Sequence, residues 1–292
     1  MFDVFKTEAG ALTYNAAYAA TLTLWPVPVE ETNLETRFGQ VHALIAGPED
    51  GYPMVLLHAT NASSTMWFPN VAALTQTHRI YALDLPGHTG KSTPSRPIEK
   101  ASDCALWIED AMDALDIEQA DLLGLSVGGW MALNLALHCP GCVRRVAALS
   151  PMGALGPVSL MLLLRMMPMV LGPTRQRLAG YIRWVSAPGT VMEPELLEQF
   201  IIGMQQFNFR NPAFFMPRPF TDAELAAITQ PALVMVGEHE VMYNGPKALA
   251  RASRLPRVTT EMIAGAGHFL SAERPDLVNR RLLAFFNSDG AA

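Results

Sequence analysis

Short runs of consecutive apolar residues alternate with longer amphipathic segments along most of the chain. Six runs have the length and aliphatic character of strands: residues 54–57, 80–83, 121–124, 146–149, 232–236 and 258–263. Continuously apolar strands are typical of a parallel sheet that is covered on both faces. Helical candidates lie among them, at residues 65–76, 98–116, 127–138, 222–229, 245–254 and 275–286. The alternation predicts an α/β architecture with a mostly parallel, doubly wound sheet, in which ligands bind at the C-terminal ends of the strands.

The first 45 residues precede this alternation. Residues 8–24 are rich in Ala and Leu and predict a helix, which ends before Trp25-Pro26-Val27-Pro28 because proline cannot continue it. Residues 36–45, interrupted by Phe38-Gly39, predict an opening hairpin. We therefore expect an N-terminal helical extension of about residues 1–30.

The alternation stops between residues 151 and 220. This interval is rich in Met and Pro and has no convincing strand, and so long a loop is improbable inside a compact domain. We interpret it as a helical cap insertion over the strand ends, with residues 1–150 and 221–292 forming the core. Its apolar stretch at 157–171 is too short to cross a bilayer and predicts a buried or lid helix.

Composition narrows the possible partners. The chain has 292 residues, 50% of them hydrophobic, which suffices for a sizeable core. Its net charge of −6, without any block of Lys or Arg, argues against nucleic acid or an anionic membrane as a partner and favours small neutral molecules. The N-terminal residues lack the pattern of a secretory signal, so we expect a cytoplasmic protein. The sequence is compatible with a monomer and with a homodimer.

The three cysteines do not predict a disulfide framework in a chain of this size. Cys139 and Cys142 have the spacing of a redox pair, but they follow the end of a predicted helix, where no helix N-terminus stabilises a thiolate. No second pair is present to complete a zinc site. We interpret them as part of an incidental loop and expect neither a metal nor a cofactor.

Gly124-Leu125-Ser126-Val127-Gly128 stands where a predicted strand turns into a predicted helix. This is the pattern of a nucleophile elbow, in which a sharp turn lifts the serine hydroxyl clear of the sheet edge. The flanking glycines remove Cβ atoms that would collide in so tight a turn. Ser126 is therefore the candidate nucleophile, next to a helix N-terminus that favours negative charge.

A serine nucleophile needs a base and an acid that orients the base. His268 lies in the glycine-flanked loop 265–269 after the last predicted strand, so it is the candidate base. Glu240 follows the strand 232–236; we favour it over Glu238 because a residue beyond the strand end has room to turn inward. Ser126, Glu240 and His268 follow one another in the order nucleophile, acid, base that is described for α/β-hydrolases.

The loop 58–63 follows the strand 54–57 and could direct a backbone N–H at a developing oxyanion, with the N–H of Val127 as the second donor. We expect the side chain of His58 to be structural and Asp84 to hydrogen-bond the turn at 84–92.

At these motifs the chain resembles α/β-hydrolase-fold enzymes, from about residue 36 to 286. The segments 24–28, 63–70 and 237–240 are similar to bacterial carboxylesterases of the naproxen-ester-hydrolysing type. The resemblance implies Glu240 as the triad acid, the backbone of Thr60 and Val127 as the oxyanion hole, and cofactor-free hydrolysis of carboxylic esters. Such enzymes usually have His-Gly where this chain has His58-Ala59. Because alanine tolerates positive φ poorly, we expect an oxyanion loop of different shape.

These residues predict a serine carboxylesterase that acts on small apolar or aryl esters through an acyl-enzyme. We expect cap methionines to line the pocket, because methionine adapts to varied shapes: Met152, Met161, Met166 and Met167. Perhydrolase or C–C bond hydrolase chemistry on the same residues stays an alternative, as does a non-catalytic hydrolase-like binding protein.

Overall fold

The structure is a computed structural model that describes residues 1–288. Its centre is one sheet with the strand order β1-β2-β4-β3-β6-β7-β8-β9, and the short β5 pairs with β2. Neighbouring strands pair parallel along the path β4-β3-β6-β7-β8-β9. At the other edge, β2 pairs antiparallel with β1, β4 and β5. The strands are β1 (Glu30–Thr36), β2 (Gly39–Ala46), β3 (Tyr52–Leu57), β4 (His78–Leu83), β5 (Thr93–Pro94), β6 (Ala120–Leu125), β7 (Val143–Leu149), β8 (Ala232–Gly237) and β9 (Val258–Ile263).

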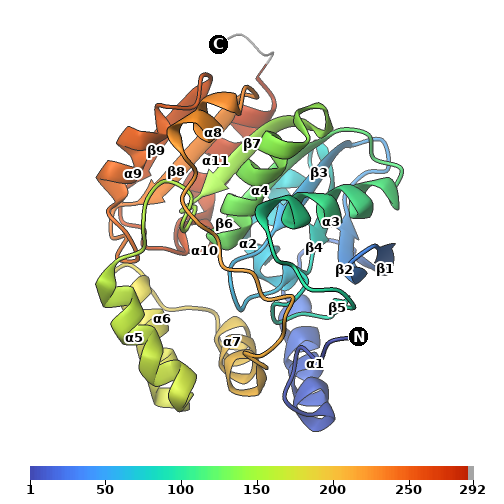
Figure 1. Cartoon of the computed structure of the whole chain (residues 1–292), viewed down its shortest axis with the longest axis vertical. Helices are drawn as coiled ribbons and strands as arrows, with labels where there is room; N and C mark the ends of the chain where they lie inside the picture. The colour runs from blue at the N-terminus through green and yellow to red at the C-terminus, as the bar shows by residue number, and fades with distance from the viewer. Residues whose placement is uncertain (289–292) are drawn as a thin grey trace.

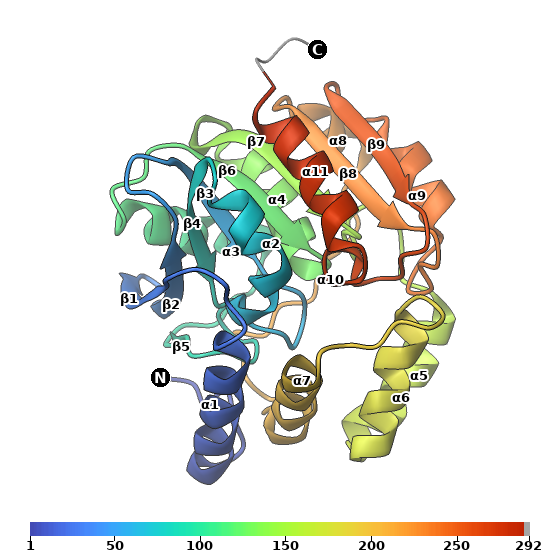
Figure 2. The same cartoon turned by 180° about the vertical axis from the view of Figure 1, so that it is seen from behind.

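Helices cover both faces of the sheet (Figures 1 and 2). One face packs against α3 (Ala101–Asp113), α4 (Val127–His138), α8 (Asp222–Ala227) and α9 (Gly245–Ala252). The other packs against α2 (Phe68–Leu74), α10 (Leu270–Glu273) and α11 (Pro275–Phe286). Successive residues of a strand enter opposite cores: Val55 contributes to the first and Leu56 to the second. This explains why the strands are apolar without alternation.

The remaining helices lie beyond the C-terminal ends of the parallel strands (Figures 1 and 2). They are α1 (Glu8–Leu22), α5 (Leu160–Leu171), α6 (Arg175–Val185) and α7 (Pro194–Gln206). The N-terminal segment is tied to the end of α7 by the backbone bond from Lys6 N–H to the Gln206 carbonyl, 2.7 Å. The N-terminal extension therefore lies beside the helices of the 151–220 interval, at the sheet edge where the site is expected.

The predicted mostly parallel α/β fold is confirmed, and the differences are local. The opening hairpin begins at Glu30 rather than near residue 36, because β1 is a largely polar edge strand without an apolar run. The helix expected at 65–76 is a 3₁₀ turn, η1 (Ser64–Trp67), followed by the shorter α2, which has Pro69 in its first turn. Helix α5 forms within the predicted apolar stretch, but much of its surface is exposed rather than buried.

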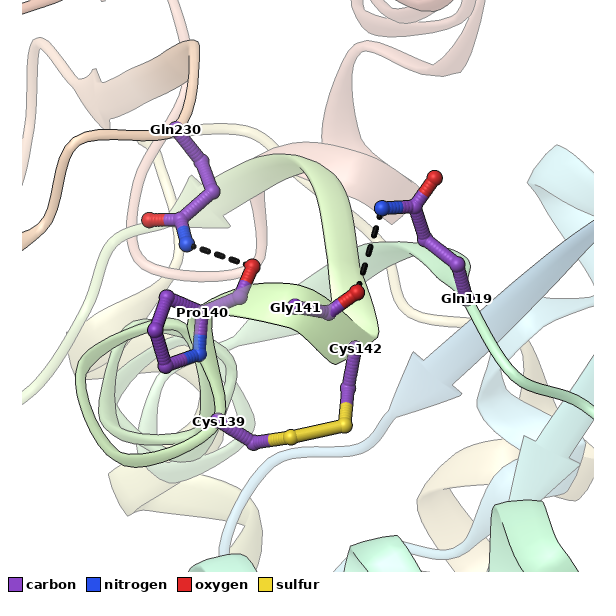
Figure 3. Close-up of a disulfide and its surroundings, with 6 residues drawn as sticks. All are labelled: Gln119, Cys139, Pro140, Gly141, Cys142 and Gln230. Carbon is purple, nitrogen blue, oxygen red and sulfur yellow. Dashed lines mark hydrogen bonds between the residues drawn. A yellow bond between two sulfur atoms is a disulfide. The ribbon is translucent and has the colours of Figure 1, made fainter.

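The interpretation of Cys139 and Cys142 as an incidental loop is wrong, because a disulfide joins them (Figure 3). The 3₁₀ turn η2 (Pro140–Cys142) at the end of α4 brings their Cα atoms to 5.4 Å, within the range that a disulfide spans. Gln230 and Gln119 donate hydrogen bonds to the carbonyls of Pro140 and Gly141, at 2.9 and 3.1 Å. The pair thus closes a hydrogen-bonded turn, and Cys104 is a buried free thiol.

None of the helices in residues 1–288 combines the length and the apolar character needed to span a lipid bilayer.

Candidate active site

Ser126 lies between β6 and α4 with a backbone of φ 58° and ψ −117°, which a residue other than glycine rarely adopts. The turn is held by close backbone contacts. A Cβ on Gly128 would lie 2.0 Å from the carbonyl oxygen of Leu57, and one on Gly124 would lie 2.1 Å from that of Gly128. Only glycine fits at either position, so the elbow predicted from the sequence is present.

His268 and Glu240 form a buried pair at the same edge of the sheet. The imidazole Nδ1 lies 2.7 Å from Oε2 of Glu240, and the side chains are 2% and 1% exposed. The other carboxylate oxygen accepts the backbone N–H of Met242 at 2.9 Å. Burial opposes ionisation of Glu240, but the charge and hydrogen bond of His268 and the Met242 N–H outweigh it, so the pKa of Glu240 is lowered. Glu240 is thus an ionised partner that fixes the imidazole.

The neighbours of Glu240 point elsewhere. Glu238 is half exposed and accepts the Gly265 N–H at 2.8 Å, and the side chain of His239 is 43% exposed. The structure therefore brings Glu240, and not Glu238, to the imidazole of His268.

Thr60 belongs to the loop after β3 and lines the same cavity as Ser126. Val127 is the first residue of α4, where an N–H has no earlier helical carbonyl to bond. Ala59 does not adopt positive φ; Asn61 does, at 57°. Alanine therefore fits the loop without backbone strain, because asparagine, which tolerates this conformation, makes the turn.

The side chains of His58 and Asp84 make structural hydrogen bonds around this loop, as the sequence predicts. The Leu85 N–H donates to Nε2 of His58 at 2.8 Å, so Nδ1 carries the proton and donates to the Ala59 carbonyl at 2.8 Å. Asp84 accepts the backbone N–H groups of Ser64 and Lys91, both at 2.8 Å.

A cavity of about 200 Å³ contains Ser126 and His268 in its wall. The rest of the wall is almost entirely apolar. Of the methionines expected there, Met152 and Met166 line the cavity. The prediction is wrong for Met161 and Met167, which lie on the outer side of α5 and are 51% and 58% exposed. Four further methionines line the cavity: Met169, Met204, Met216 and Met242.

Comparison with known proteins identifies the family of the chain. The model of the alpha/beta hydrolase family matches residues 54–281, which include Ser126, Glu240 and His268. The chain belongs to the alpha/beta hydrolase family.

Relatives of this alpha/beta hydrolase extend over nearly its whole length. "Uncharacterized carboxylesterase nap" of Bacillus subtilis (strain 168) is 39% identical over 284 residues, 95% of this chain and 93% of that protein. Carboxylesterase YbfK of the same organism is 37% identical over 291 residues, 96% of each chain. The crystal structure of naproxen esterase (carboxylesterase NP) from Bacillus subtilis has a TM-score of 0.92 at 36% identity, covering 97% of this chain and 100% of that one.

Sequence reasoning missed Glu273, which holds the histidine loop of this hydrolase. Its carboxylate accepts the backbone N–H groups on both sides of His268, from Gly267 at 2.9 Å and Phe269 at 3.0 Å. The same carboxylate accepts the N–H of Ala187, just after α6, at 2.7 Å. It therefore links the loop of the candidate base to the helices above the sheet.

Gln199 on α7, also missed, holds the other side of the site. Its buried amide donates to Ser63 Oγ at 2.8 Å and to the Tyr14 hydroxyl at 3.1 Å, and accepts from Thr65 Oγ1 at 2.9 Å. The loop that carries Thr60 is thus tied to α7 and to the N-terminal helix. The contacts of the two residues span from 4 to 185 positions, and those that reach Ala187 and Tyr14 leave no mark in the local sequence.

No group of three or more His, Cys, Asp or Glu side chains within residues 1–288 is arranged to hold a metal ion.

Proposed function

We propose that this protein is a serine carboxylesterase that hydrolyses small esters with apolar or aryl groups. The observation that carries the proposal is the hydrogen bond between Glu240 and His268, together with an apolar cavity that has both His268 and Ser126 in its wall. The names of the relatives, carboxylesterases and a naproxen esterase, support it.

In the proposed mechanism, Glu240 holds Nδ1 of His268, so that Nε2 accepts the proton of Ser126 as its oxygen attacks the ester carbonyl. The N–H groups of Thr60 and Val127 bind the oxyanion. His268 then protonates the leaving alcohol, and water attacks the acyl-enzyme to release the acid. No cofactor enters these steps.

We further propose that residues 151–220 act as a cap over a core of residues 1–150 and 221–292. Support comes from α5, which contributes Leu162 and Met166 to the cavity wall, and from α7, which contributes Phe200 and Met204. Methionine-rich walls accommodate apolar groups of varied shape, which favours aliphatic or aryl acyl groups. The cytoplasmic location stays a prediction.

The test is turnover of p-nitrophenyl esters of increasing acyl length by the wild type and by Ser126→Ala. We expect hydrolysis by the wild type and a loss of about 10⁴-fold or more in the variant, because only binding and the oxyanion donors would still act. Ser271→Ala, which removes a buried hydroxyl outside the cavity, is the control and should keep the activity.

Absence of ester turnover would contradict the proposal. Parallel assays of peracid formation and diketone cleavage separate the alternatives: faster turnover there would assign perhydrolase or C–C bond hydrolase chemistry. Inactivity in all three assays would favour a non-catalytic binding protein.

A further inference from the structure

Helix α5 presents an exposed apolar surface. Among the described side chains of this helix, six apolar ones are 51% to 80% exposed. We call these six residues the α5 face: Leu160, Met161, Leu163, Leu164, Met167 and Leu171. In both views α5 lies at the periphery of the molecule beside α6, away from the central sheet (Figures 1 and 2). Contiguous exposed apolar side chains of this kind mark an interaction surface.

The cavity of the candidate active site reaches the surface beside this face. Leu162, Met166 and Met169 point from α5 toward the cavity and line it. Leu163 and Met216 also line the cavity, yet they are 52% and 54% exposed. An apolar molecule held at the α5 face would therefore lie next to the opening that leads to Ser126.

The charge around α5 is positive, in contrast to the chain as a whole. Between Asp121 and Glu193 the sequence has no acidic residue, whereas α5 and α6 carry four exposed arginines: Arg165, Arg175, Arg177 and Arg183. Arg175 pairs with Glu198. Within residues 1–288 the other three form no ion pair with a carboxylate. Arg177 donates to the carbonyl of Gly172 at 2.9 Å and Arg165 lies over the Trp184 ring, and neither contact neutralises the positive charge.

We propose that the α5 face docks onto a lipid surface that carries anionic headgroups. Apolar side chains flanked by arginines are the features that bind a helix to such a surface, where the apolar groups enter the acyl boundary and the guanidinium groups meet phosphates. Entry of esters from that surface into the cavity rests on the proposed esterase function, but the docking itself does not.

A second copy of this chain fits the face less well. A twofold interface brings the same patch of both copies together. It would place arginines that lack a carboxylate partner opposite one another, and the face itself supplies no carboxylate. The net charge of −6 led us to expect no anionic membrane partner; the sum over the whole chain conceals this locally basic, apolar end.

The test is co-sedimentation of the full chain with vesicles of phosphatidylcholine alone or mixed with phosphatidylglycerol. We expect binding only to the anionic vesicles, weakened by salt. Leu164→Glu combined with Met167→Glu should abolish it, and Arg183→Gln should weaken it about fivefold, the share of one surface arginine. Leu12→Glu, at a 65% exposed position on α1, is the control and should bind like the wild type.

Leu164 and Met167 do not line the cavity, so hydrolysis of a monomeric soluble ester should be unchanged in that double variant. Binding is also measured with Ser126→Ala, which separates failure of docking from failure of the esterase proposal. Three results would overturn the docking proposal: no binding to anionic vesicles, equal binding to neutral vesicles, or binding unaffected by the double variant. A wild-type dimer that the double variant dissociates would assign the face to a second copy instead.

Discussion

At the elbow around Ser126, backbone approaches backbone so closely that a single added carbon at Gly128 would overlap the Leu57 carbonyl. The cavity wall contributed by α5 and α7 consists of leucine, methionine and phenylalanine side chains, which make non-directional apolar contacts. The first region requires particular residues at particular positions, whereas the second requires only volume and polarity. Short local motifs therefore determine the position of the candidate nucleophile. Substrate preference depends on apolar packing that many different sequences can provide.

The largest effect should come from removing the base. His268→Ala is expected to lower kcat about 10⁴-fold, because the proton of Ser126 then has no acceptor. Glu240→Gln should cost less, since the imidazole is still present although less well oriented. Steady-state kinetics with a p-nitrophenyl ester measure both. Equal activity of His268→Ala and wild type would contradict the claim that the site requires particular residues at particular positions.

Next comes the backbone of the elbow. Gly128→Ala is expected to cost about 3 kcal/mol of folding stability or more, because the new Cβ would lie 2.0 Å from backbone. Gly156→Ala in the 151–220 interval is the matched control: a Cβ there has nothing within 4 Å, so its effect should stay within about 0.5 kcal/mol. Urea unfolding measures both, and similar losses would contradict the comparison.

Glu273 joins the two regions, so its removal should give an intermediate effect. In Glu273→Gln one acceptor oxygen is replaced by an NH₂ group that faces backbone N–H donors. We expect a loss of about 1–3 kcal/mol in stability and a fall in kcat larger than any rise in KM, because the loop of His268 loses its support. Glu193→Gln, at the start of α7, is the control. A KM effect alone would assign Glu273 to substrate binding.

The smallest effect is expected in the wall. Met166→Leu conserves volume and should change stability by less than about 1.5 kcal/mol. Its effect on kcat/KM should depend on acyl length, because Met166 lines the cavity, whereas Met167→Leu on the exposed side should leave the preference unchanged. A uniform loss for all esters in Met166→Leu would show that this wall is as restrictive as the elbow.

The sequence sufficed where a residue's environment is set by its neighbours in the chain. The glycines around Ser126 and His268 mark turns that few other sequences form, and the apolar strands identify the buried sheet. The prediction of Glu240 as the acid rested on its distance beyond the end of β8, which distinguishes it from Glu238. The parallel pairing then brings these strand ends to one edge.

Other features depend on distant partners and could not be predicted in this way. Glu273 acts through Ala187, 86 positions away, and Gln199 through Tyr14, 185 positions away. The orientation of α5 was missed for a different reason. Arg165 is the one polar residue in the sequence of α5, too few to form a polar stripe that shows which side is buried, so the sequence does not place Met161 and Met167 on the outer side.

The central claim is that Ser126 is a nucleophile activated by His268 and Glu240. Covalent labelling with a fluorophosphonate, followed by intact mass measurement and peptide mapping, tests it most directly. The account predicts one adduct per chain, located on Ser126, with labelling slowed strongly in His268→Ala. A wild-type protein that stays unlabelled, or carries the adduct on a different residue, would contradict it.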